Sequence, residues 1–194
     1  SPSGHYVDTS AATAPTPCSS GTYNPSLGSN TSLDCMHADP GYAVPDPGSS
    51  YQTPCTPGHY QPSSGQTSCL EADAGHFVSS QGADSQTPCS VGTYTANTSQ
   101  SACTEAAPGH YVSTPGSTYE EACSIGTYNT QTASTSASDC LPADAGNYVP
   151  MAGAAEQIPC VEGTYQPSIG QSSCIMSDPG HYVPGANFQS QLEC

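Results

Sequence analysis

The sequence contains no lysine and no arginine, whereas sixteen of its 194 residues are aspartate or glutamate. Proteins that bind nucleic acids neutralise phosphates with cationic side chains, and anionic membrane surfaces repel acidic chains. We therefore expect no nucleic-acid partner. No apolar run approaches the ~20 residues of a membrane-spanning helix, so we also expect no membrane insertion in this segment.

Material for an ordinary hydrophobic core is also scarce. There is no tryptophan, phenylalanine occurs twice, and the hydrophobic fraction is 34%, against a usual ~45–50%. Glycine and proline contribute 19 residues each, and serine plus threonine contribute 50. Such a chain would be disordered without cross-links, but it contains eleven cysteines. We expect disulfides to replace apolar burial, which places the chain in an oxidising, extracellular or cell-surface setting.

A glycine that is followed two positions later by an aromatic residue recurs along the whole chain. The eleven glycines are Gly4, Gly21, Gly41, Gly58, Gly75, Gly92, Gly109, Gly126, Gly146, Gly163 and Gly180, spaced by 17 residues with two three-residue insertions. The aromatics are Tyr6, Tyr23, Tyr60, Phe77, Tyr94, Tyr111, Tyr128, Tyr148, Tyr165 and Tyr182. The exception is Ala43, where Tyr42 stands one place earlier. A fixed period indicates a tandem array, and we expect each ring to form the core of its module.

The cysteines divide these modules into two alternating kinds. In cysteine modules one cysteine lies three residues before the glycine and a second closes the module, giving Cys18–Cys35, Cys55–Cys69, Cys89–Cys103, Cys123–Cys140 and Cys160–Cys174. Cysteine-free modules carry neither, as at Ala72 and Gln86. Because both cysteines are present or absent together, we predict five disulfides, each within one module. Spacing alone also permits pairing across the junctions, such as Cys35–Cys55. Cys194 stands where another module would begin, so we expect its partner beyond the chain end.

Turn chemistry indicates the local structure. Asp-Pro-Gly at 39–41 and 178–180 suits a type II turn, and the residues that follow favour short strands. We predict a small disulfide-rich β and irregular fold: an elongated, solenoid-like tandem array of 17-residue modules with no helix. The expected boundaries are a cysteine-free module at 1–17, repeat units at 18–54, 55–88, 89–122, 123–159 and 160–193, and the start of another unit at 194.

A known motif extends over the whole chain, module by module, and one stretch carries it best. Cys55-Thr-Pro-Gly58-His-Tyr60-Gln-Pro62, ending in Ser68-Cys69, resembles the ephrin-receptor-like cysteine-rich repeats, which are related to EGF-like and TNF-receptor-like modules. Cys160 to Cys174 resembles them nearly as well. The resemblance implies an extracellular cysteine-rich repeat, as in receptor ectodomains and in protist and algal surface proteins, including mastigoneme-like proteins.

No residue pattern predicts catalysis or a metal site. The histidines His5, His59, His76, His110 and His181 follow module glycines without the clustered spacing of zinc ligands. Asp39, Asp73, Asp144 and Asp178 are more typical of turn residues than of calcium ligands. Glu120 and Glu121 are consecutive, and no nucleophile motif accompanies them. We therefore expect no enzyme activity, no metal and no cofactor apart from covalent glycans.

The chain contains two acceptor sequences for N-linked glycans. Asn30-Thr-Ser and Asn97-Thr-Ser are sequons, and Asn30 lies in a three-residue insertion. Our functional hypothesis is a structural subunit of an extracellular, glycosylated filament or surface coat, which associates with further copies of itself. The alternative is a receptor or adhesin stalk that binds a protein or carbohydrate, the latter on its tyrosine ladder. A third reading, an ice-binding threonine-rich solenoid, has only irregular Thr-x-Thr support.

Overall fold

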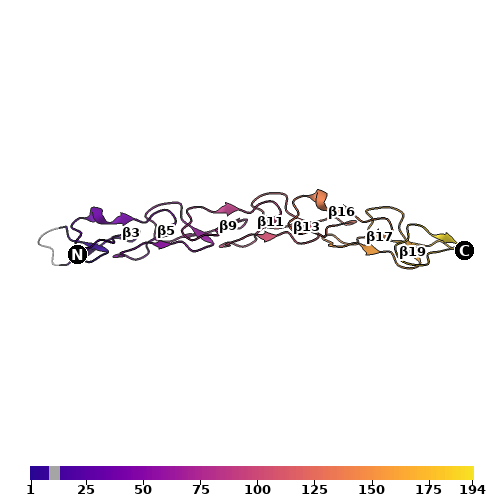
Figure 1. Cartoon of the computed structure of the whole chain (residues 1–194), viewed down its shortest axis with the longest axis horizontal. Coiled ribbons are helices and arrows are strands. Elements are labelled where there is room, and N and C mark those ends of the chain that lie inside the picture. The colour runs from indigo at the N-terminus through magenta and orange to yellow at the C-terminus, as the bar shows by residue number, and fades with distance from the viewer. Residues whose placement is uncertain (9–13) are drawn as a thin grey trace. The chain divides into compact units, whose positions relative to one another are not determined.

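The structure is a computed structural model that describes residues 1–8 and 14–194. It divides into two compact units. Unit 1 comprises Ser1–Pro88 and Thr95–Cys103, and unit 2 comprises Cys89–Tyr94 and Thr104–Cys194. Each unit is a succession of short strands joined by irregular loops (Figure 1), so the prediction of a disulfide-rich, mostly irregular repeat protein is confirmed.

Every hairpin joins two antiparallel strands of two residues each. In unit 1 the pairs are β1 (His5–Tyr6) with β2 (Thr16–Pro17), β3 (Thr22–Tyr23) with β4 (Met36–His37), β5 (Tyr42–Ala43) with β6 (Thr53–Pro54), β7 (His59–Tyr60) with β8 (Leu70–Glu71), and β9 (His76–Phe77) with β10 (Thr87–Pro88).

In unit 2 they are β11 (Thr93–Tyr94) with β12 (Thr104–Glu105), β13 (His110–Tyr111) with β14 (Glu121–Ala122), β15 (Thr127–Tyr128) with β16 (Leu141–Pro142), β17 (Asn147–Tyr148) with β18 (Ile158–Pro159), β19 (Thr164–Tyr165) with β20 (Ile175–Met176), and β21 (His181–Tyr182) with β22 (Leu192–Glu193). One hairpin therefore corresponds to one module of the sequence period.

The two modules with a three-residue insertion each contain a short helical turn. A single 3-10 turn, η1, spans Ser32–Asp34, and a second, η2, spans Ala137–Asp139. Thr31 and Ser136 cap their N-termini, and Asp139 completes a capping box with Ser136. The expectation of no helix thus holds for α-helices among the described residues and misses these 3-10 turns, which the caps allow in so short a loop.

A β-turn precedes the first strand of each module, and the module glycine occupies its third position. The Tyr42 N–H donates to the Asp39 carbonyl at 3.0 Å, which closes one such turn. The φ angles of the module glycines lie between 76° and 86°. A positive φ at this position defines the predicted type II turn and favours glycine.

The buried core lies on either side of these turns, and the prediction that the aromatic rings form it was wrong. The buried positions come three residues before the glycine (Cys18, Ala38, Cys55, Ala72, Cys89, Ala106, Cys123, Ala143 and Cys160) and three residues after it (Asn24, Val44, Gln61, Val78, Thr95, Val112, Asn129, Val149, Gln166 and Val183). The module aromatics are half-buried, and Tyr182 is 46% exposed. Backbones of neighbouring modules approach to hydrogen-bond distance at the buried positions, so only small or slender side chains fit there.

Backbone hydrogen bonds connect each module to the following one in both directions. The Gly41 N–H donates to the Gln61 carbonyl at 2.7 Å, and the Gly65 N–H donates back to the Ala38 carbonyl at 2.8 Å. The same two bonds recur in unit 2, from Gly146 to Gln166 and from Gly170 to Ala143. Each hairpin, which would be unstable alone, is therefore stabilised by its neighbours, as in a solenoid.

Modules two places apart also touch, at the module glycine. A Cβ atom placed on Gly41 would lie closer than 3.0 Å to the carbonyl oxygen of Gly82. The same clash occurs for Gly4, Gly21 and Gly58 within unit 1, and for Gly92, Gly109, Gly126 and Gly146 within unit 2. Since the two kinds of module alternate, these contacts join cysteine modules to cysteine modules and cysteine-free modules to cysteine-free modules.

Candidate functional site

The first candidate site is the set of disulfides that close the cysteine modules. Cys18–Cys35, Cys55–Cys69, Cys123–Cys140 and Cys160–Cys174 are bonded, with Cα–Cα distances of 5.6 to 5.8 Å. Cys89 and Cys103 are also disulfide-bonded. The bonds run within modules and not across the junctions, since Cys35 is joined to Cys18. A closed loop of about fifteen residues stabilises a fold by ~3 kcal/mol in the chain-entropy model.

Cys194 is free and exposed. Its N–H donates to the Gly180 carbonyl at 3.0 Å, as the Cys18 N–H donates to Gly4 at 2.9 Å. The backbone of Cys194 therefore has the position of the first cysteine of a cysteine module. Its partner beyond the chain end stays a prediction.

Four cysteine-free modules are closed by a hydrogen-bonded clasp between a glutamine at the second cysteine position and the aspartate directly after the first. The Asp39 N–H donates to Gln52 Oε1 at 2.7 Å, and Gln52 Nε2 donates to Asp39 Oδ2 at 2.7 Å. The clasp recurs at Asp73–Gln86, Asp144–Gln157 and Asp178–Gln191. The aspartates expected as turn residues thus also bind a glutamine side chain, which the sequence analysis missed. The signal was available, because glutamine stands fourteen residues after a small residue in each of these modules.

One cysteine-free module uses glutamate for the same purpose. Glu120 Oε2 accepts from the Ala107 N–H at 2.8 Å, and Glu120 Oε1 lies 4.0 Å from His110 Nδ1. Glu121 contacts other groups, since it accepts from the Tyr111 hydroxyl at 3.1 Å and from Ser113 Oγ at 3.0 Å. Burial raises the pKa of the Tyr111 hydroxyl, and the hydrogen bond and negative charge of Glu121 raise it further. The two glutamates therefore have separate structural partners.

Buried polar side chains occupy the cysteine modules where the cysteine-free modules carry valine. Gln61 is 4% exposed; its Nε2 donates to the Ser68 carbonyl at 2.8 Å, and its Oε1 accepts from the Ser63 N–H at 3.1 Å. Gln166 makes the equivalent bonds. In the two longer loops the residue is asparagine, and Asn24 Nδ2 reaches Ser29 Oγ at 2.8 Å. The side chain thus spans the loop that the disulfide closes and satisfies its buried backbone groups. Sequence analysis missed this alternation of amide and valine.

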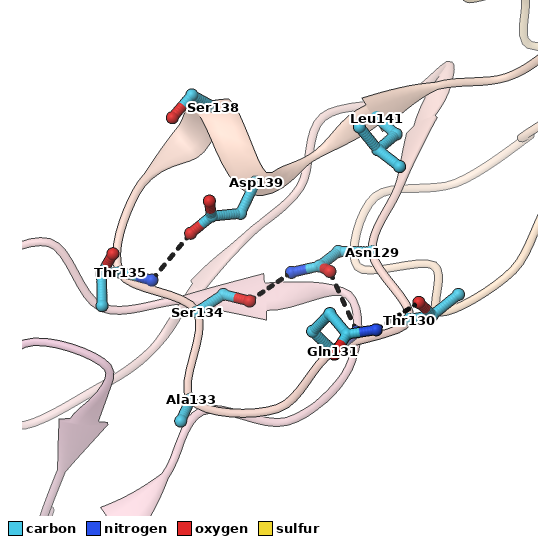
Figure 2. Close-up of a pocket in the computed structure, with 9 residues that line it drawn as sticks. All are labelled: Asn129, Thr130, Gln131, Ala133, Ser134, Thr135, Ser138, Asp139 and Leu141. Atoms are coloured by element: carbon cyan, nitrogen blue, oxygen red, sulfur yellow. Dashed lines mark hydrogen bonds between the residues drawn. The ribbon is translucent and has the colours of Figure 1, made fainter.

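A hollow of about 440 Å³ lies in the longer loop of module 123–142 (Figure 2). Figure 2 shows Asn129 donating to Ser134 Oγ and Asp139 accepting from the Thr135 N–H, at 2.6 and 2.9 Å. Asn129 Oδ1 also accepts from the Gln131 N–H at 3.0 Å. These polar groups bind one another, so the loop is organised by its own side chains.

The histidines do not form a cluster, and the ring nitrogens of four of them have a partner within their own module. His5, His76 and His110 place Nδ1 3.1 to 3.4 Å from a backbone oxygen two residues earlier, and His59 Nδ1 lies 3.4 Å from Thr56 Oγ1. Within residues 1–8 and 14–194, no three histidine, cysteine, aspartate or glutamate side chains come together as metal ligands would. In the same part of the chain, no helix is long and apolar enough to cross a membrane.

Residues 41–89 match the family described as tyrosine-protein kinase ephrin type A/B receptor-like. This stretch resembles an ephrin-receptor-like repeat. The ephrin-receptor-like match covers about a quarter of the chain and includes the Cys55–Cys69 disulfide and the Asp73–Gln86 clasp. No curated protein matches the chain. The disulfides and the ephrin-receptor-like match together indicate an extracellular or surface location.

The ephrin-receptor-like stretch contains neither sequon, but both sequons lie on exposed loops of cysteine modules. Asn30 is exposed and directly precedes Thr31, the cap of η1. Asn97 is exposed, and its carbonyl accepts from Thr95 Oγ1 at 3.4 Å. A glycan on either side chain would extend into solvent without displacing a buried group.

Proposed function

We propose that this chain is a structural segment of an extracellular, glycosylated filament or surface coat built from cysteine-rich repeats. The observation that carries the proposal is the repeated backbone lattice. Modules bind the next one through the Gly41–Gln61 and Gly65–Ala38 types of hydrogen bond, and eight of them touch the one after that at the module glycine. Such an arrangement can be extended by repetition, since its stability comes from neighbour contacts and local staples and not from one large core.

The two kinds of link that close the modules, disulfides and hydrogen-bonded clasps, suit a protein that must persist outside cells. Disulfides close one kind of module, and clasps such as Gln52–Asp39 close four modules of the other kind without needing an oxidant. The charge of −16 with no cation keeps separate copies soluble until specific contacts form. Glycans at Asn30 and Asn97 would add to that solubility.

The test is to secrete the 194-residue chain from a eukaryotic host and examine it by negative-stain electron microscopy over a range of concentrations. We expect open-ended fibres with no partner added, and glycopeptides at Asn30 and Asn97 by mass spectrometry. The N30Q/N97Q variant is the matched control for glycan-dependent solubility. A chain that stays monomeric at every concentration would instead favour the receptor or adhesin stalk.

A further inference from the structure

One module departs from the aromatic pattern, and the structure has a hollow at that place. Ten of the eleven modules carry an aromatic ring two residues after the glycine, whereas module 38–54 carries Ala43 there. Ala43 pairs with Thr53 across the hairpin, as Tyr148 pairs with Ile158 in unit 2. Ala43 and Tyr148 therefore occupy the same position of the repeat, but only Tyr148 has a ring there.

The neighbouring Tyr42 does not fill the missing position. The Tyr42 hydroxyl and ring lie 3.6 and 3.7 Å from where a Cβ of Gly82 would be. At the corresponding turns, His5 contacts Gly48 and His110 contacts Gly153. Tyr42 thus occupies the place that His5 and His110 have in their modules, against the module two places along.

The hollow beside Ala43 has a volume of about 320 Å³. Pro45 and Pro54 form part of its wall together with the Cys55–Cys69 disulfide, His59 and Thr67. At the corresponding place in unit 2, Tyr148 itself lines a hollow of about 240 Å³ beside Cys174. The hollow at Ala43 lies at the low end of the ~300–1,000 Å³ typical of ligand sites, which fits one ring better than a larger ligand.

We propose that this hollow is the seat of a tyrosine ring from a second copy of the chain, and that the ring is Tyr119. The proposal rests on the self-association set out under Proposed function. Tyr51 and Tyr119 are the most exposed aromatic side chains among the described residues, at 69% and 67%. Prolines, a disulfide and an alanine offer a ring the apolar contact that Tyr148 obtains within its own chain.

Charge favours this seat over other surfaces. Two copies of charge −16 repel, and no lysine or arginine is available for a salt bridge between them. Tyr119 is followed by Glu120 and Glu121, so it must dock where acidic groups are few. The hollow is lined by no acidic residue, and it includes His59.

Tyr119 is assigned in preference to Tyr51 because of the assembly that each would produce. Tyr51 belongs to the same module as the hollow, so a Tyr51 contact made reciprocally would close into a dimer. Tyr119 lies four modules further along the sequence, so its contact with Ala43 of a second copy can repeat from copy to copy. Made in this head-to-tail way, the contact leaves a free ring and a free hollow for further copies, as a fibre requires.

The experiment compares the intact, oxidised chain with three variants by analytical ultracentrifugation at low and moderate ionic strength. A43F fills the hollow with the ring that other modules carry, Y119S removes the docking ring, and Y51S is the matched control at the same repeat position. We expect A43F and Y119S each to weaken association at least tenfold, with Y51S unchanged. Added salt should strengthen association of the unaltered chain by screening the repulsion.

Four outcomes separate the alternatives. If the unaltered chain associates and A43F associates equally well, the seat is wrong while the filament proposal stands. If Y51S and not Y119S loses association, the assignment of Tyr119 is overturned in favour of a closed dimer. If A43F loses association but neither tyrosine variant does, the occupant is wrong. If the unaltered chain never associates, both proposals fail. Y119S alters an exposed side chain, so its folding is secure even if A43F folds poorly.

Discussion

Replacing Gly21 by alanine should destabilise the chain much more than replacing Gly28, although both residues belong to one module and both have positive φ angles, 81° and 74°. An L-residue with a Cβ pays about 1–2 kcal/mol for this left-handed conformation. At Gly28 nothing lies within 4 Å of the added atom, so that cost is the whole effect.

At Gly21 the added Cβ would instead press on backbone two modules away. It would lie closer than 3.0 Å to the carbonyl oxygen of Gly65, which cannot rotate away as a side chain could. Overpacking of this kind costs about 1–3 kcal/mol beyond the conformational cost. The backbone must move to relieve this overlap, and the movement strains the 2.8 Å hydrogen bond from the Gly21 N–H to the Val44 carbonyl. Such a bond contributes roughly 1 kcal/mol. We therefore expect G21A to lose about 2–4 kcal/mol more than G28A.

The assay is guanidinium unfolding with disulfides intact, followed by the near-ultraviolet circular dichroism of the tyrosines and extrapolated to water. Because repeat arrays can unfold in parts, amide hydrogen exchange supplies a local measurement. G21A should accelerate exchange around Val44 and Gly65, and G28A should not. Equal losses of stability in the two variants would refute the reasoning, since the contact between modules two apart would then carry no energy.

Three further predictions concern the staples and polar groups. The double variant A72C/Q86C should form a disulfide spontaneously, because the clasp between Asp73 and Gln86 brings Gln86 to the residue next to Ala72, and these two positions carry the cysteines in neighbouring modules; intact mass and thiol titration would detect the bond, and two persistent free thiols would contradict the equivalence. The pKa of the Tyr111 hydroxyl is raised in the folded chain. The protonated hydroxyl therefore stabilises the fold fully below pH ~10, and this stabilisation is lost as the pH rises through the pKa of the folded state. Carbon-13 NMR of labelled tyrosines should show E121Q lowering that pKa, and no change would rule out the Glu121 contribution. N24A should cost about 1–3 kcal/mol in chemical denaturation, because it leaves Ser29 Oγ and the Ser26 N–H without the partner they have now, and an unchanged midpoint would show that water replaces it.

Much of the local structure could be predicted from the sequence because its causes lie within a few residues. A glycine after Asp-Pro sets the turn at 39–41, and short strands follow it. The alternation of cysteine pairs also points to bonds within modules, and Cys55 is joined to Cys69 in the structure. In each of these cases the relevant residues belong to one module, so the repetition of the pattern identifies them.

The arrangement of modules against one another was decided only by the tertiary structure. Near-identical modules offer several pairings with the same local pattern, and nothing within one module says that Gly21 must lie beneath Gly65. That close approach leaves no space for rings. The aromatic side chains therefore lie half-buried at the surface, and smaller residues such as Ala38 and Val44 form the core. The clasp between Gln52 and Asp39 likewise depends on the hairpin bringing together residues thirteen apart. The sequence by itself thus determined the period and the turns, while the packing of backbone on backbone determined the core.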